Sequence, residues 1–194
     1  MGGELPEDIP DFEHEARLTL EDLDIQPFWE TEQVHAFDCG NEDLNDFLST
    51  EEVRRYEQEM VGKTYLVFHK GRLVGFFTVS QGGLRIEYLR KWKSFSRMSE
   101  MKLEAIPALV IGRLAVDGGH QGRGIGRALI KYIAGMAIET QGKMGVRLLI
   151  LQAKPESIEF YMKCGFQLTV PTARERKRKN RTMFFDLSSI DEIA

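Results

Sequence analysis

The sequence predicts an α+β fold in which helices pack on a central sheet of six or seven strands. Helical and extended patterns follow one another irregularly along the 194 residues, which is the order expected for a mixed sheet with helices. The length and an apolar content of 42% are sufficient for one sizeable core. The chain contains no run of about 18 apolar residues, so the sequence predicts no membrane-spanning helix.

The first half of the chain supplies a short strand, two helices and a hairpin. Apolar and polar residues alternate over 16–23, which indicates a strand. Asn41 can cap a first helix, and Ser49 with Glu52 forms a capping-box pattern for a second. The apolar runs 63–69 and 72–80 flank Lys70-Gly71 and predict a β-hairpin.

The second half alternates buried strands with helices. Segments 108–117 and 146–153 are apolar enough to be strands buried on both faces. Between them, 126–139 carries an apolar stripe at helical spacing. A further helix begins near Pro155 and ends near Gly165, in agreement with the usual positions of proline and glycine at helix ends. The last strand is predicted at 182–187.

Charge is distributed unevenly and suggests two parts. Residues 1–32 hold eleven acidic side chains and one basic side chain, so this segment carries −10. The whole chain carries −4, which leaves +6 for the remainder. We therefore expect a flexible acidic arm at 1–16 and a single domain at 17–194.

The cysteines and histidines indicate a reducing compartment and no metal site. Cys39 and Cys164 do not form a disulfide framework, which favours a reduced cytoplasmic protein. The four histidines show no spacing typical of metal ligands, either among themselves or with the cysteines. No metal is therefore predicted.

A glycine-rich stretch, GGHQGRGIGRALI at 118–130, lies between a buried strand and a helix. A nucleotide P-loop requires G-x-x-x-x-G-K-[ST], but Arg127-Ala128 follow Gly126. The dinucleotide fingerprint G-x-G-x-x-G also fails, because the glycines at 122, 124 and 126 are one residue too close. Two interpretations remain: a pyrophosphate cradle at a helix N-terminus, or a tight turn with no ligand.

The segment FYMKCGF at 160–166 favours the cradle. Together, Q-x-x-G-x-G at 121–126 and FY-x-x-x-GF at 160–166 resemble the GNAT superfamily of acyl-CoA-dependent N-acetyltransferases. The resemblance covers roughly 30–187. It implies the GNAT fold, with a central mixed, mostly antiparallel six- to seven-stranded sheet and helices on both faces. It also implies acetyl-CoA as co-substrate.

The same resemblance assigns roles to particular residues. Tyr161 is the implied catalytic residue, a general acid that protonates the departing CoA thiolate. The implied pantetheine-binding residues, which also steady the oxyanion, are Leu114, Ala115 and Val116. The implied pyrophosphate-binding residues are Gln121, Gly122, Arg123, Gly124, Ile125 and Gly126, with added charge from Arg127. Lys154 and Ser157 depart from the family pattern, which often has asparagine and alanine there.

The acceptor is less constrained. The stretches 37–48 and 106–129 resemble a GNAT subgroup that includes toxins acetylating aminoacyl-tRNA, which implies an antitoxin partner and admits a homodimer. Basic segments at 85–102 and 173–181 suit a phosphate backbone if they line the acceptor cleft. They are equally consistent with solvated surface. Glu87 and Glu104 are candidate general bases, beside an ordered water or an already neutral amine.

Three functions therefore stay open. The first is an N-acetyltransferase acting on a tRNA-linked or protein amine. The second is a small-molecule amine acetyltransferase, which the basic 173–181 tract disfavours for a polyamine. The third is a non-catalytic acyl-CoA-binding module, which Tyr161 and the complete glycine loop disfavour.

Overall fold

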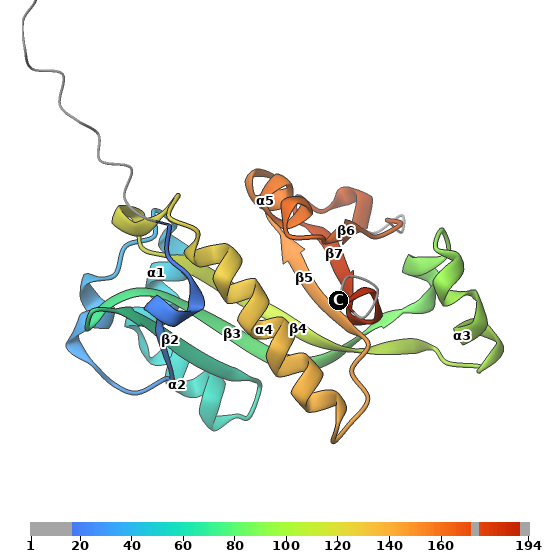
Figure 1. The fold of residues 1–194 in the computed structure, drawn as a ribbon, viewed down its shortest axis with the longest axis horizontal. Helices are drawn as coiled ribbons and strands as arrows, with labels where there is room; N and C mark the ends of the chain where they lie inside the picture. The colour runs from blue at the N-terminus through green and yellow to red at the C-terminus, as the bar shows by residue number, and fades with distance from the viewer. Residues whose placement is uncertain (1–16, 172–174, 191–194) are drawn as a thin grey trace, which may run out of the picture.

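The computed structural model describes residues 17–171 and 175–190, which form one seven-stranded sheet with helices on both faces (Figure 1). The predicted acidic arm at 1–16 lies outside the described residues. The strands are β1 (Asp24–Pro27), β2 (Lys63–His69), β3 (Arg72–Arg85), β4 (Ala105–Val116), β5 (Leu148–Ala153), β6 (Gln167–Leu168) and β7 (Arg181–Asp186). The α-helices are α1 (Glu42–Ser49), α2 (Glu51–Gln58), α3 (Ser96–Glu100), α4 (Ile125–Gln141) and α5 (Ile158–Lys163).

The strand order is β1-β2-β3-β4-β5-β7-β6. The β4–β5 pair is parallel, and every other neighbouring pair of described strands is antiparallel. The predicted mixed, mostly antiparallel sheet is thus confirmed. No helix within the described residues is both long and apolar enough to span a bilayer.

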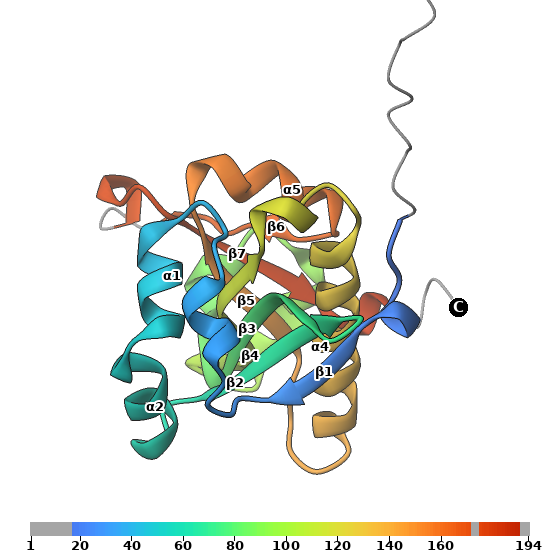
Figure 2. The ribbon, with the colours of Figure 1, turned by 90° about the vertical axis from the view of Figure 1, so that its left-hand side faces the viewer.

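The two faces of the sheet bury separate apolar clusters. Successive residues of a strand point to opposite faces, and β3 uses this alternation: Phe76 packs with α1 and α2, and Phe77 packs with α4. Figure 2 shows α1 and α2 on one side of the sheet and α4 on the other. Helix α5 joins the α4 side, where Phe160 and Tyr161 contact the same cluster.

Two local predictions near the N-terminus were wrong. None of the described residues of the predicted strand at 16–23 forms a strand, because the backbone N–H of Thr19 donates to Asp22 Oδ2 at 2.8 Å. That bond folds Leu20–Asp22 into a 3-10 turn, and the strand begins only at Asp24. The second helix is capped by Thr50, whose hydroxyl accepts from the Glu52 N–H, and Ser49 instead ends α1. The Asn41 cap of α1 is confirmed.

The connection between β3 and β4 forms a third small cluster at the far end of the sheet. Leu89 and Phe95 are buried there with Phe184 of β7. Trp92 meets Phe184 edge to face at 4.8 Å, and its Nε1 donates to Gln167 Oε1 at 2.5 Å. In Figure 1 this connection, with α3, lies at the opposite end of the molecule from α1 and α2.

Candidate functional site

Strands β4 and β5 pair only over part of their length. Their parallel register runs from Ala108 opposite Leu148 to Ile111 opposite Leu151, and β4 then continues to Val116 paired with β3 but not with β5. The separation begins at a β-bulge, since Thr78 of β3 faces Arg113 and Val79 faces Ile111, which leaves Gly112 without an opposite residue. A bulge bends its strand, so β4 leaves β5 at this position and opens a wedge in the sheet.

The glycine loop lies at the wide end of that wedge. Gly122 and Gly124 have φ of +78° and +92°, a region that favours glycine. Gly124 is the N-cap of the 17-residue helix α4, and no side chain caps this helix end. The first N–H groups of α4, together with the positive end of its dipole, therefore face the loop without a side-chain acceptor.

A cavity of about 420 Å³ follows the loop. Seven of the nine predicted cofactor residues line it, as do five further residues. The predicted ones are Leu114, Val116, Gln121, Gly122, Gly124, Ile125 and Gly126; the others are Arg17, His120, Arg127, Ser157 and Phe160. Gln121 also braces the loop, because its Nε2 donates to the carbonyl oxygens of Cys39 and Val116, both at 3.0 Å.

Ala115 and Arg123 do not line this cavity. Ala115 is buried on the opposite face of the sheet with the α1 cluster, as strand alternation requires between Leu114 and Val116. The carbonyl oxygen of Arg123 accepts from the Leu18 N–H at 2.8 Å, which ties the loop to the segment entering the fold. Any contact of Ala115 with a ligand in the cavity would therefore come from its backbone.

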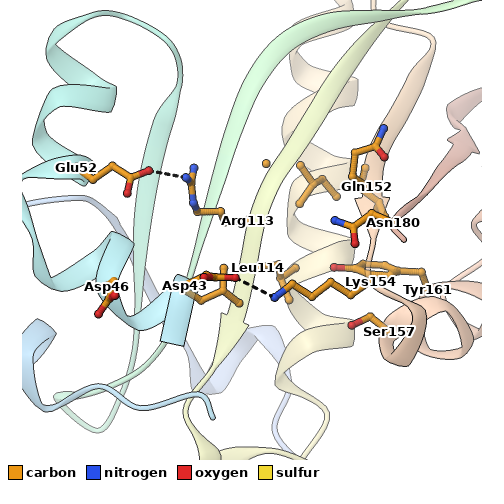
Figure 3. Close-up of a pocket in the computed structure, with 14 residues that line it drawn as sticks. Asp43, Asp46, Glu52, Arg113, Leu114, Gln152, Lys154, Ser157, Tyr161 and Asn180 are labelled. Carbon is orange, nitrogen blue, oxygen red and sulfur yellow. Dashed lines mark hydrogen bonds and ion pairs between the residues drawn. The ribbon is translucent and has the colours of Figure 1, made fainter. Parts of the chain in front are cut away.

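A second cavity, of about 550 Å³, contains Tyr161. In Figure 3 Asp43, Asp46 and Glu52 stand on the side of α1 and α2, while Lys154, Ser157 and Tyr161 stand on the opposite side. Arg113 and Leu114 of β4 lie between these walls. Leu114 and Ser157 line both cavities, so the two spaces meet at these residues.

Tyr161 is held in an apolar environment. Its ring packs against Phe160 and Phe166, with ring centroids 5.0 and 5.7 Å apart. Burial is the main reason that the pKa of Tyr161 rises to about 12, and nearby Cys164 adds to the rise. The phenol therefore keeps its proton throughout the physiological range and can act as a hydrogen-bond donor.

Ion pairs organise the charges of the Tyr161 cavity. Arg113 lies over the Phe47 ring at 3.6 Å, and its Nη2 is 2.8 Å from Glu52 Oε1. Lys154 Nζ is 3.5 Å from Asp43 Oδ2. Within residues 17–171 and 175–190, Asp46 forms no ion pair. The sequence patterns had singled out none of these three acids as a site residue, and Glu52 only as part of a helix cap.

The expected acceptor-side residues are mostly elsewhere. Glu87 and Glu104 do not line the Tyr161 cavity, and neither does any described part of 85–102. The aromatic residues of that segment pack into the third cluster and its rim. Of the described part of 173–181, Asn180 lines the cavity, and Arg176, Lys177, Arg178 and Lys179 are exposed beside it in sequence. No metal-binding group of three His, Cys, Asp or Glu occurs in the described parts.

Comparisons with known proteins agree with this geometry. The model of the acetyltransferase (GNAT) domain matches residues 61–168. A tRNA-acetylating toxin of Mycobacterium tuberculosis (strain ATCC 25618 / H37Rv) is 24% identical over 141 residues, covering 72% of this chain and 81% of the toxin.

Solved structures share the fold. AtaT complexed with acetyl-methionyl-tRNAfMet superposes with a TM-score of 0.74 at 24% identity, over 89% of this chain and 99% of AtaT. A mutant of KacT gives 0.75 at 23% identity, with the same coverage. Because the family model spans more than half of the sequence, this chain belongs to the GNAT family of acetyltransferases, which use acetyl-CoA as acetyl donor.

Proposed function

We propose that this protein transfers the acetyl group of acetyl-CoA to the amino group of an aminoacyl-tRNA. The observation that carries the proposal is the junction of the two cavities at Leu114 and Ser157. A donor whose pyrophosphate lies at the glycine loop and whose pantetheine follows β4 would bring its thioester to that junction. The acceptor amine would reach the same point from the Tyr161 cavity.

The reaction is a direct displacement. The neutral amine nitrogen attacks the thioester carbonyl carbon, the new C–N bond forms and the C–S bond breaks. Tyr161 gives its phenolic proton to the departing sulfur, and a backbone N–H on the edge of β4 that has left β5 steadies the oxyanion. The amine must also lose a proton, and we assign Asp46 to receive that proton. Among the three carboxylates of the cavity, Asp46 is the one that forms no ion pair with a described lysine or arginine.

The glycine loop supplies the donor site. The N–H groups at the start of α4 would bind the pyrophosphate, and Gly122 and Gly124 would let the backbone approach it without a Cβ. Leu114 and Val116 would contact pantetheine along the wedge. Arg127 would add positive charge, and Gln121 would act by holding the loop in shape.

Two features favour a nucleic-acid-linked acceptor. Exposed basic residues at 176–179 come directly before Asn180, which lines the Tyr161 cavity. Such residues suit a phosphate backbone. Moreover, the relative from Mycobacterium tuberculosis is a tRNA-acetylating toxin, AtaT has been solved with acetyl-methionyl-tRNAfMet, and a mutant of AtaT has been solved with the C-terminus of the antitoxin AtaR. An antitoxin partner, a homodimer and a cytoplasmic location stay predictions for this chain.

A second candidate acceptor is a small cationic amine. The basic 173–181 tract disfavours a polyamine, but three carboxylates line the Tyr161 cavity, namely Asp43, Asp46 and Glu52. Two of them are paired with Lys154 and Arg113, which leaves one unpaired acid in the described structure. We therefore rank this acceptor second.

The experiment supplies acetyl-CoA labelled in the acetyl group and compares charged tRNA, uncharged tRNA and spermidine. We expect label in charged tRNA alone and matching release of CoA thiol. Tyr161→Phe should lower kcat by about 10²-fold or more. Tyr132→Phe is the matched control, because Tyr132 packs on Phe77 and lines neither cavity. Label in spermidine but not in charged tRNA would support the second candidate and overturn the first.

A further inference from the structure

A third cavity adjoins the glycine loop on the side away from β4. Its volume is about 460 Å³. It is lined by Arg17, Leu18, Thr19, Leu20, Glu21, Gly124, Arg127, Ala128 and Lys131. Arg17, Gly124 and Arg127 line this cavity and the loop cavity alike, so Gly124 separates two adjacent spaces. The proposed donor site gives no role to the remaining residues of the third cavity.

The segment that walls this cavity is anchored to the loop. The Leu18 N–H donates to the Arg123 carbonyl at 2.8 Å, and the Leu18 side chain is buried in the α4 cluster. A Cβ on Gly124 would lie 3.0 Å from Arg17 Cγ, which means that the aliphatic part of Arg17 packs against the glycine. Arg17 is thus held beside the loop although it lies 44 positions before the first residue of the family match.

The charges around the cavity are unbalanced. Arg17, Arg127 and Lys131 face one carboxylate, Glu21, and none of the three forms an ion pair with an acid in the described part of the chain. Arg127 and Lys131 are also four residues apart on α4, where like charges repel and destabilise the helix. An anion between these side chains would turn this repulsion into attraction.

CoA carries three phosphate groups, of which two form the pyrophosphate and the third is on the 3′ position of the ribose. We propose that Arg17 and Lys131 bind the 3′-phosphate in the third cavity, with Arg127 between it and the pyrophosphate. The inference rests on the proposed position of the pyrophosphate at the glycine loop. It assigns to this chain a specificity for CoA over CoA that lacks the 3′-phosphate, and it gives residues 17–21 a role in binding.

The test measures the affinities of the full-length protein for CoA and for 3′-dephospho-CoA by calorimetry. The wild type should bind CoA the more tightly. Lys131→Ala and Arg17→Ala should each weaken CoA binding about tenfold or more, the effect typical of a lost charge-assisted hydrogen bond. Lys131 does not line the loop cavity, so Lys131→Ala should alter dephospho-CoA binding by no more than about twofold and the preference for CoA should collapse. Arg17 lines both cavities, so Arg17→Ala should weaken CoA binding more than dephospho-CoA binding.

The controls separate this site from other effects. Lys143 is exposed just beyond α4, so Lys143→Ala removes the same charge away from the cavity and should leave both affinities unchanged. Arg17→Lys should restore part of the preference. Equal losses for the two ligands, or a wild type with no preference, would overturn the inference.

The affinities also distinguish this inference from the proposed acceptor. They are measured without acceptor, so a protein that discriminates the two ligands but does not acetylate charged tRNA supports the 3′-phosphate site and overturns only the acceptor. Conversely, acetylation of charged tRNA with no discrimination overturns only the 3′-phosphate site.

Discussion

Lys154 and Asp43 lie 111 positions apart in sequence and meet across the Tyr161 cavity, with Nζ 3.5 Å from Oδ2. Asp43 is on α1, and Lys154 directly follows β5 (Figure 3). The side chain of Asp43 is 89% exposed and that of Lys154 is 35% exposed. A pair this exposed contributes at most about 1 kcal/mol to stability, so its consequence is for the cavity that it crosses rather than for folding.

Replacing each member of this ion pair in turn should change the affinity for the acceptor in opposite directions. Asp43→Asn removes a negative charge and leaves Lys154 unpaired, which should lower KM for charged tRNA by roughly threefold, since electrostatic complementarity raises association. Lys154→Ala leaves Asp43 unpaired and should raise that KM. Steady-state kinetics at low salt checks both. Lys163→Ala removes a lysine from an exposed i,i+4 pair with Glu159 and is the control. A shift of the same sign in both variants would contradict the assignment.

Replacement of glycine by alanine should destabilise the protein at Gly112, in the β4 bulge, but not at an exposed glycine within a helix. A Cβ at Gly112 would lie 2.7 Å from Thr78 Oγ1, and Thr78 is fully buried. Gly112→Ala should therefore cost about 2 kcal/mol of unfolding free energy and weaken acetyl-CoA binding. Gly135 in α4 has no atom within 4 Å of the same position, so Gly135→Ala should stabilise by about 0.5–1 kcal/mol. Urea unfolding compares them, and equal effects would argue against the bulge as the constraint.

Regular patterns in the sequence predicted most of the fold. The Asn41 cap, the hairpin around Lys70-Gly71 and the helix after the glycine loop all depend on local chemistry, and each is confirmed. Alternation at 16–23 predicted a strand that the described residues do not form, because the hydrogen bond between Thr19 and Asp22 favours a 3-10 turn instead. Strand β6 has two residues, too few to produce a pattern.

The site was predicted less completely, for two reasons. Strand alternation places the Ala115 side chain on the face opposite to Leu114 and Val116, so its contact with pantetheine stays a prediction for its backbone alone. Asp43, Lys154 and Arg17, by contrast, reach the cavities only through contacts between distant segments. No local pattern distinguishes them from ordinary surface charges.

Trp92 should stabilise the fold without contributing to nucleic-acid binding. Trp92 packs on Phe184 and donates a hydrogen bond to Gln167. Like the other aromatic residues at 85–102, it packs in the third cluster and is therefore not free to stack on bases. Trp92→Ala should cost about 2 kcal/mol and leave the affinity for tRNA unchanged below the unfolding temperature. Replacing Arg176 and Lys177 by Ala should instead flatten the salt dependence of binding. A loss of tRNA affinity in Trp92→Ala with unchanged stability would reverse this assignment.

The buried phenol of Tyr161 should make the folded state lose stability at alkaline pH. Its pKa is about 12 in the fold because burial disfavours phenolate, against an ordinary value of 10.0. Between these values the unfolded chain releases the proton while the folded chain retains it, so the unfolding free energy falls as pH rises from 10 to 12 and is unaffected below 10. The full effect is at most about 3 kcal/mol.

Urea unfolding at pH 9, 10 and 11 should therefore give a flatter profile of unfolding free energy against pH for Tyr161→Phe than for the wild type. Tyr65, whose pKa is also raised by burial, acts in the same direction in both proteins and cancels in the comparison. A Tyr161→Phe profile parallel to the wild type would show that the phenol is not held protonated by burial.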